Sequence, residues 1–182
     1  MSNSTPYMQP DQINALIDEM AIKLRELIEE RPIENPQMIG IHTGGIWLAE
    51  RLHKMVGIKE ALGTLDISFY RDDFSRIGMN PKVQPSHFPF EVDDRNIILV
   101  DDVLCSGRTI RAALNEIFDY GRPASVALVT LVDRSGRELP IEPAVSGLHI
   151  DLQPGEHITL TGPEPLQLVL GTESNRKSRN TS

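Results

Sequence analysis

The chain has 182 residues, of which 40% are hydrophobic and 24% charged, a composition typical of one soluble globular domain with a proper core. It contains no apolar run of the roughly 18 residues that cross a bilayer, its N-terminus lacks the pattern of a signal peptide, and its single cysteine excludes a disulfide within the chain. A cytoplasmic protein is the simplest interpretation, and the formal net charge of −8 disfavours general attraction to nucleic acid.

The first part of the chain predicts a helix, a short strand and a second helix. Apolar residues recur every three or four positions through residues 11–30, which predicts an amphipathic helix that Pro32 ends. Residues 38–42 predict a short strand, and the turn Thr43-Gly44-Gly45 leads into a helix over about residues 46–56. The predicted core face of the first helix consists of Ile13, Leu16, Ile17, Met20, Leu24, Leu27 and Ile28.

A strand and a long polar segment follow. Residues 65–70 alternate between apolar and polar side chains, which predicts a strand. Residues 71–90 are polar, contain three prolines and show no period. A loop of that length inside a compact domain is usually functional, or else it is a sign of missed structure.

The second part of the chain alternates buried strands with a helix. Residues 97–100 are apolar on both faces, residues 108–120 show helical spacing that stops at Gly121-Arg122-Pro123, and residues 125–132 form another apolar run. This order predicts an α/β domain around a mainly parallel sheet flanked by helices. Further short strands are predicted at residues 148–152, 157–161 and 166–170.

Both ends of the chain differ in composition from the part between them. We expect a single domain over residues 11–171, a flexible N-terminus over residues 1–10 and a disordered tail over residues 172–182. The tail, TESNRKSRNTS, has no apolar residue with which to pack.

The stretch IILVDDVLCSGRT, residues 97–109, places two carboxylates at the end of a buried strand. Ligands of parallel α/β sheets bind beyond that end of the strands. Asp101 and Asp102 only accept hydrogen bonds, which suits the vicinal hydroxyls of a ribose or the water shell of Mg²⁺.

The next five residues, 105–109, precede a helix and suit a phosphate. A helix N-terminus offers unpaired N–H groups, Gly107 allows a close approach, and Ser106 and Thr109 add hydroxyls. The spacing differs from that of a nucleotide P-loop, so the combination predicts a site for a ribose 5′-phosphate. The alternative is an ordinary strand-to-helix turn capped by an aspartate.

These residues closely resemble the phosphoribosyl-pyrophosphate (PRPP) signature of type I phosphoribosyltransferases. Longer segments resemble one branch, the PyrR family of pyrimidine operon regulators that are also uracil phosphoribosyltransferases. The resemblance spans about residues 11–171 and implies a type I phosphoribosyltransferase fold with a small hood and a flexible active-site loop. The segments that carry it are GIHTGGIWLAERL (40–52), LDISFYRDD (65–73), VDDVLCSGRT (100–109) and GRPASVALVTLVDRSGRELPI (121–141).

The resemblance implies an enzyme that converts uracil and PRPP to UMP and pyrophosphate. Asp101 and Asp102 would bind the ribose hydroxyls and, through water, the Mg²⁺ that comes with PRPP, without ligating the metal directly. The base would be framed by Val132, Asp133 and Arg134, whose side chain packs on the ring. The 5′-phosphate would be held by Cys105, Ser106, Gly107, Arg108 and Thr109.

Pyrophosphate would be received by Thr43, Gly44 and Gly45, where relatives often carry an arginine in place of Gly44. Two glycines before a helix can present N–H groups to an anion, although a simple helix-initiating turn is the alternative. Arg71 is the predicted catalytic residue of the loop. Arg76 and Lys82 either join it in neutralising pyrophosphate or belong to a solvated surface.

Cys105 bears on the choice of base, since many purine enzymes of this superfamily carry an aspartate at that position for the purine N7. A thiol is a weak hydrogen-bonding group, so a pyrimidine is favoured. The alternative function is a sensor of uridine nucleotides such as UMP and UTP that regulates transcription or binds RNA, with little or no turnover. Arg134 and Arg137 would contact RNA, but Gly136 replaces a histidine of RNA-binding relatives, so we expect weak binding. The family also implies a homo-oligomer, a dimer or higher.

Overall fold

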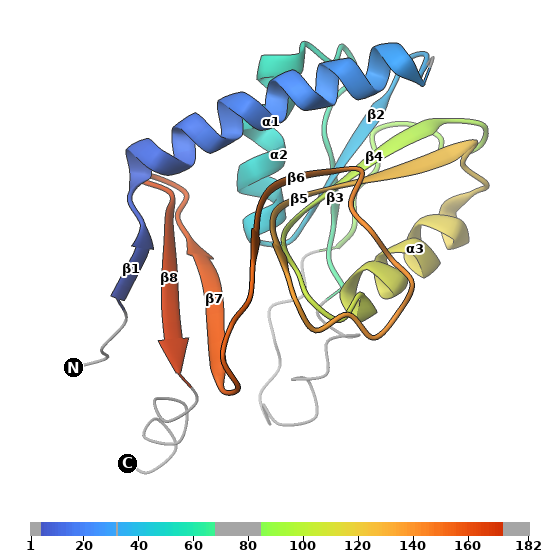
Figure 1. The fold of residues 1–182 in the computed structure, drawn as a ribbon. Coiled ribbons are helices and arrows are strands. Elements are labelled where there is room, and N and C mark those ends of the chain that lie inside the picture. Colours follow the sequence, from blue (N-terminus) through green and yellow to red (C-terminus); the bar gives the residue numbers. More distant parts are fainter. Residues whose placement is uncertain (1–4, 32, 68–84, 173–182) are drawn as a thin grey trace.

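The structure is a computed structural model that describes residues 5–31, 33–67 and 85–172 (Figure 1). Three helices and eight strands are assigned within those residues. In chain order they are β1 (Thr5–Met8), α1 (Pro10–Glu30), β2 (Gln37–Ile41), α2 (Gly44–Val56), β3 (Gly63–Leu65), β4 (Asn96–Leu104), α3 (Arg108–Tyr120), β5 (Ser125–Arg134), β6 (Val145–Ile150), β7 (Glu156–Thr161) and β8 (Gln167–Thr172).

The strands form two sheets. The central sheet has the order β3-β2-β4-β5-β6, and every neighbouring pair in it is parallel. The second sheet, β1-β8-β7, is antiparallel and lies beside one end of the central sheet (Figure 1). The predicted α/β fold around a mainly parallel sheet is therefore confirmed. We call the β1-β8-β7 sheet the hood, because it lies where the predicted fold has a small hood.

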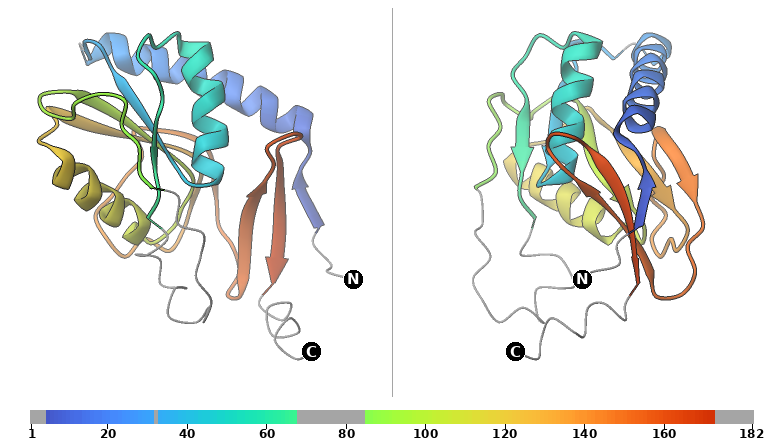
Figure 2. Two further views of the ribbon diagram at one scale, coloured as in Figure 1. Left: turned by 180° about the vertical axis from the view of Figure 1, so that it is seen from behind. Right: turned by 90° about the vertical axis from the view of Figure 1, so that its left-hand side faces the viewer.

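Helices cover both faces of the central sheet, as the views in Figures 1 and 2 show. One buried cluster joins α1 and α2 to the sheet through residues such as Leu24, Leu48 and Val100, and it continues into the hood. A second cluster joins α3 to the opposite face through Leu99 and Ile117. None of the described helices is long and apolar enough to span a membrane.

The first helix follows its apolar pattern closely. It begins at Pro10, where a proline at the first helical position loses no hydrogen bond, and it ends at Glu30. Of the predicted core face, Leu16 and Ile28 are partly buried and the other members are buried. This pattern is predictable because one face of the helix packs against α2, β6 and β8.

Several strand boundaries differ from the predictions. The strand predicted at residues 65–70 is observed as β3, Gly63–Leu65, and the predicted residues 68–70 lie outside the described ranges. Strand β4 continues to Leu104, past the predicted end at residue 100, because its pairing with β5 continues through Leu104 and Asp133. Strand β6 begins at Val145, earlier than predicted, and joins the parallel sheet.

Part of the N-terminal segment belongs to the second sheet. Within residues 1–10, for which the sequence predicts flexibility, Thr5–Met8 form β1, which pairs with β8 through Thr5 and Leu170. Four residues are too few to show a clear pattern in the sequence, and their partner strand lies at the other end of the domain. The hood therefore contains strands from both ends of the described chain.

Of the long polar segment predicted at residues 71–90, the structure describes residues 85–90, and before it the chain is described up to residue 67. We call residues 64–67 and 85–90 the two margins. Thr64 and His87 exchange two backbone hydrogen bonds of 2.8 Å, which bring the two margins together. The Ser86 hydroxyl accepts the N–H of Asp66 at 3.3 Å and donates to Glu116 of α3 at 3.0 Å. Both margins are thus tied to the same side of the sheet as α3.

Candidate active site

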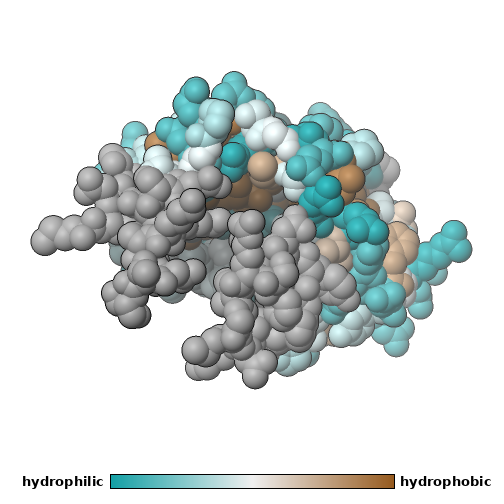
Figure 3. All heavy atoms as spheres, turned by 90° about the horizontal axis from the view of Figure 1, so that it is seen from below, coloured by the Kyte–Doolittle hydropathy of each residue, from teal (hydrophilic) through white to brown (hydrophobic). Residues whose placement is uncertain are grey.

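Parallel strands place the predicted site residues at one edge of the sheet. Strand β2 ends just before the turn at residues 43–45, β4 ends before the turn at residues 105–107, and β5 ends with Asp133 and Arg134. Because β2, β4 and β5 are neighbours and point the same way, these segments meet at the carboxyl edge. Figure 3 views the molecule from below and shows hydrophobic residues near the centre, with hydrophilic residues above them and to their right.

Asp101 and Asp102 lie inside β4 and have different surroundings. Both carboxylates lie near the start of α2, because a Cβ on Gly44 would meet Asp102 and a Cβ on Gly45 would lie 3.4 Å from Oδ1 of Asp101. Asp101 is 2% exposed, and its Oδ1 accepts the N–H of Asp102 at 3.0 Å. Asp102 is half-buried and lies on the face covered by α2. The pair therefore consists of a buried hydrogen-bond acceptor, Asp101, and an accessible one, Asp102.

The N-terminus of α2 packs directly against Asp102. A Cβ atom placed on Gly44 would lie 2.7 Å from Cγ of Asp102, which is closer than real atoms approach. A Cβ on Gly45 would lie 2.6 Å from the Val100 carbonyl oxygen. We expected Gly44 to mark the loss of a charged contact with pyrophosphate, and the structure shows that the Asp102 carboxylate occupies the space beside it. The two glycines thus let the first turn of a helix contact the signature strand.

The carbonyl groups of the turn after β4 are all hydrogen-bonded within the protein. Gly107, with φ +90°, begins α3 in a left-handed conformation that glycine adopts readily. Each of the three carbonyls in residues 105–107 accepts hydrogen bonds. The donors are the Arg137 guanidinium for Cys105, the N–H groups of Glu138 and Leu139 at 3.0 Å each for Ser106, and the N–H of Arg111 at 2.9 Å for Gly107.

The hydrogen bonds of the carbonyl oxygens bear on what this turn can bind. Because the protein itself donates to these oxygens, the N–H groups of the turn can face an anion without the carbonyl oxygens facing it as well. The Ser106 hydroxyl accepts the N–H of Arg108 at 3.2 Å and so helps to fix the turn. Thr109 is half-buried in the first turn of α3. The Arg108 side chain forms an ion pair of 2.6 Å with Glu138, and both side chains are about half exposed.

The residues predicted to frame the base, Val132, Asp133 and Arg134, lie at the end of β5. Val132 is buried, whereas the other two are half-buried. The Asp133 carboxylate is already bonded on both oxygens, to Arg137 at 2.5 Å and to His149 at 3.2 Å. It can therefore frame a base through its backbone more readily than through its side chain. The Arg134 Nε is buried and lacks a hydrogen-bond partner among the described residues.

Sequence reasoning missed the network of Arg137, Asp133 and His149. The signal that could have found it is the pairing of β5 with β6, which places Asp133 opposite His149. That register could not be inferred because β6 begins earlier than its predicted position. The predicted loop residues Arg71, Arg76 and Lys82 lie outside the described ranges, so their roles remain predictions.

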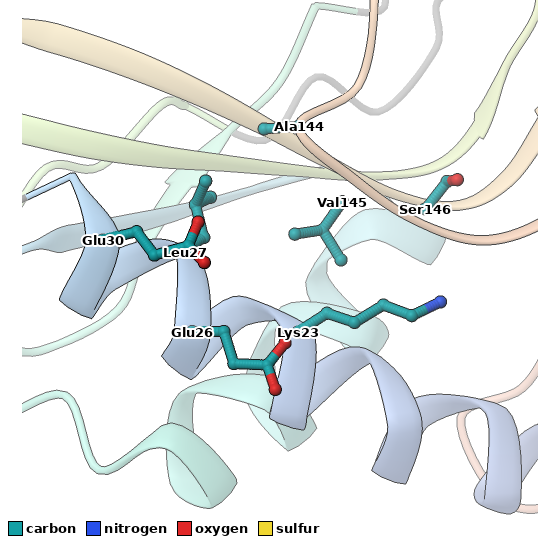
Figure 4. A pocket seen from close by; sticks show the side chains of 7 residues that line it. All are labelled: Lys23, Glu26, Leu27, Glu30, Ala144, Val145 and Ser146. Carbon is teal, nitrogen blue, oxygen red and sulfur yellow. The ribbon is translucent and has the colours of Figure 1, made fainter.

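Two grooves in the described structure lie away from this edge. One, of about 340 Å³, is bordered by α1 and the start of β6, where the Lys23 side chain runs below Val145 toward Ser146 (Figure 4). The other, of about 370 Å³, lies between α3, the start of β5 and the segment 140–144. Both are near the amino ends of β5 and β6, so neither includes a predicted site residue.

Comparison with known proteins agrees with this arrangement. The sequence model of the phosphoribosyl transferase domain matches residues 9–163. The hypoxanthine phosphoribosyl transferase of Trypanosoma cruzi superposes with a TM-score of 0.71 at 15% identity, covering 98% of this chain and 96% of that one. A hypoxanthine phosphoribosyltransferase from Staphylococcus aureus gives a TM-score of 0.62 at 17% identity, covering 81% and 77%. The family model, which covers most of the chain, and the fold together define a phosphoribosyltransferase.

More similar sequences specify the branch. The bifunctional protein PyrR of Nitrosococcus oceani is 60% identical over 160 residues, covering 87% of this chain and 90% of the relative. The bifunctional protein PyrR of Pseudomonas paraeruginosa is 60% identical over 153 residues, covering 84% and 90%. The chain belongs to the PyrR family, as the sequence motifs indicated.

Proposed function

We propose that the protein is a cytoplasmic uracil phosphoribosyltransferase that also regulates pyrimidine biosynthesis genes. The observation that carries the enzymatic part is the meeting of three features at one sheet edge. These are the Asp101–Asp102 pair, the glycine turn at the start of α2, and the turn before α3, whose carbonyl oxygens accept hydrogen bonds from the protein. Vicinal hydroxyls, pyrophosphate and a 5′-phosphate are the three parts of PRPP that such groups would bind.

The reaction needs negative charge at the ribose. The bond from the anomeric carbon of PRPP to the pyrophosphate oxygen breaks, pyrophosphate leaves with the electron pair, and that carbon bonds to N1 of uracil, which loses its proton. Positive charge develops on the ribose ring in the oxocarbenium-like transition state, and carboxylates fixed beside the ring would stabilise it. The buried Asp101 and the accessible Asp102 supply this charge from a rigid strand.

Mg²⁺ would be bound together with PRPP. The donor set fits a hard cation through water, because carboxylate oxygens are its preferred protein ligands and Asp102 is accessible at the sheet edge. Among the described residues, no group of three His, Cys, Asp or Glu side chains is placed to hold a metal directly. When bound, the ion neutralises part of the charge of the leaving pyrophosphate.

A pyrimidine base is supported by the chemistry of Cys105. Its thiol lies 3.7 Å from the Ser135 carbonyl oxygen, which makes it at most a weak donor that is already directed toward the protein. A carboxylate at this position would accept a hydrogen from a purine, whereas the thiol offers no such acceptor. Backbone groups at the end of β5 would then select uracil by its amide-like edge.

The decisive experiment is a turnover assay. Purified protein with uracil, PRPP and Mg²⁺ should form UMP and pyrophosphate, and hypoxanthine in place of uracil should give little product. The same preparation should bind UMP in a calorimetric titration. Binding of UMP with no turnover of uracil would leave the alternative function, a sensor of uridine nucleotides that regulates genes without catalysis.

A further inference from the structure

Arg137 lies in the connection between β5 and β6 and joins two parts of the site. One terminal nitrogen of its guanidinium donates to the Cys105 carbonyl, and the other donates to Oδ1 of Asp133 at 2.5 Å. The Nε is 3.7 Å from a carboxylate oxygen of Glu142. The Arg137 side chain is only 20% exposed, so these contacts are made in a largely enclosed position.

The contact with Cys105 fixes the start of the phosphate turn. Of the carbonyls in that turn, those of Ser106 and Gly107 are bonded by backbone N–H groups, whereas that of Cys105 is bonded by the Arg137 side chain. Without this donor the Cys105 carbonyl would have to find another partner or rotate toward the anion. Rotation toward a phosphate would be repulsive, because both groups carry negative charge at oxygen.

The contact with Asp133 fixes the base-framing end of β5. Asp133 on β5 is paired with Leu104 on β4 and with His149 on β6. Its second oxygen is 3.2 Å from the His149 ring. A single guanidinium therefore connects the phosphate turn after β4 to the strand end that would frame the base.

We propose that Arg137 is a positioning residue that holds the phosphate turn and the base-framing strand end in register, so that PRPP and uracil bind with their reacting atoms aligned. The inference rests on the proposed phosphoribosyltransferase function and adds a residue to it. Arginine suits the role because its planar fork donates to two acceptors in fixed directions, whereas the lysine ammonium is a single point charge.

This role differs from the RNA contact expected from the sequence. A residue that binds RNA phosphates needs its charge at the surface, but the two terminal nitrogens of Arg137 are directed at Cys105 and Asp133. The charge is offset by the Asp133 carboxylate at 2.5 Å. RNA binding by Arg137 is therefore an outcome that the experiment below separates from positioning.

The test compares Arg137→Lys and Asp133→Asn with Glu142→Gln, which alters only the exposed partner at 3.7 Å. Calorimetry with PRPP and Mg²⁺, without uracil, gives the dissociation constant for PRPP, and steady-state kinetics give KM and kcat. Losing a charge-assisted hydrogen bond should weaken PRPP binding about tenfold or more in Arg137→Lys. In Arg137→Lys, KM for PRPP and for uracil should rise by a larger factor than kcat falls. Asp133→Asn should change PRPP affinity and KM in the same direction. Glu142→Gln should have the wild-type values.

A double variant and a fold control make the outcome decisive. Arg137→Lys with Asp133→Asn should lose no more PRPP affinity than Arg137→Lys alone, because both changes remove the same connection. Wild-type PRPP affinity in Arg137→Lys would overturn the inference. A lower thermal midpoint of Arg137→Lys with unchanged KM would also overturn it. The same holds if this variant loses only its binding to leader RNA. Failure of the wild type to bind PRPP would overturn the proposed function and, with it, this inference.

Discussion

Asp102 is the accessible member of the carboxylate pair, and its position depends on the glycine beside it. Asp101 is buried and accepts a hydrogen bond from the backbone of Asp102. A substitution of Asp101 would therefore affect folding as well as catalysis. Asp102 lies against Gly44 at the edge of the sheet, where it contacts the start of α2 without being enclosed by it. This makes Asp102 the better residue for a test of catalysis.

Replacing Asp102 by Asn should lower kcat for UMP formation by about a hundredfold, because the substitution keeps the size of the side chain and removes its negative charge. The thermal midpoint should change little, since the backbone bond to Asp101 does not depend on the Asp102 side chain. The measurement is a steady-state assay beside a thermal melt. Asp119→Asn, at an exposed position of α3, is the matched control and should leave both unchanged. A large loss of stability with normal kcat would instead indicate a structural role for Asp102.

Single residues of the site were predictable where the motif itself fixes the chemistry. The pair Asp101–Asp102 and the turn at residues 105–109 were assigned from residue types and from their place between a strand and a helix, and the structure brings them to one sheet edge. The contact between Gly44 and Asp102 was not predictable, because it depends on how closely α2 approaches β4. Sequence spacing carries no information on that distance.

At the scale of elements, α2 determines where the pyrophosphate turn lies. The helix packs on β2 at Gly40, where an added Cβ would be 2.9 Å from the Ile46 Cα and 3.1 Å from the Gly45 carbonyl oxygen. These neighbours are backbone atoms of the first turn of α2, which cannot move away as a side chain can. The turn that would bind pyrophosphate is therefore held by a close contact between a helix and a strand.

Gly40→Ala should displace the first turn of α2 and raise KM for PRPP, with a loss of stability of about 1–3 kcal/mol from overpacking. Chemical denaturation and steady-state kinetics would measure the two effects. Gly63→Ala on the neighbouring strand β3 is the control, because an added Cβ there meets the side chains of Ile39 and Phe90 at 3.1 and 3.3 Å. Those side chains can yield, so KM should stay near the wild-type value. Equal effects of both substitutions would contradict the role given to α2.

The helices were predicted more accurately than the strands for a physical reason. The range predicted for α3, residues 108–120, matches the observed helix, because a glycine precedes it and a Gly-Arg-Pro sequence stops it. The apolar pattern predicts that the strand ends at residue 100, whereas β4 continues through Asp101 and Asp102 to Leu104. Strand pairing continues through polar residues as long as a neighbouring strand supplies hydrogen bonds, and the sequence of one strand does not show its neighbour.

At the scale of the whole molecule, the distribution of charge bears on regulation. The net charge is −8, and exposed positions of α1 carry Asp18, Glu19, Glu26, Glu29 and Glu30. Among the basic residues of α1, Arg25 donates a hydrogen bond to the Met55 carbonyl. Arg137 is engaged inside the protein, whereas Arg31, Arg95, Arg111 and Arg122 are exposed. The acidic net charge, rather than a shortage of surface arginines, therefore disfavours binding to an RNA backbone.

Binding to a pyrimidine-leader RNA should therefore be weak at physiological salt, with a dissociation constant of about a micromolar or higher, because RNA affinity depends on the number of cationic contacts with phosphates. A gel shift with the leader and with a scrambled RNA of equal length would measure affinity and specificity together. Nanomolar binding to the leader alone would contradict this expectation. Gene regulation with weak RNA binding would then require another partner, such as a protein or DNA.

The composition of the hood has a consequence for how the protein is made. Strand β1 pairs with β8, so the hood joins the beginning of the described chain to its end (Figure 1). On a ribosome, the strands of the central sheet emerge well before β8, and domains fold as their elements become available. The hood can therefore be completed only when synthesis of the domain is almost finished. A nascent chain would therefore contain strand β4 with the PRPP signature before the hood is complete.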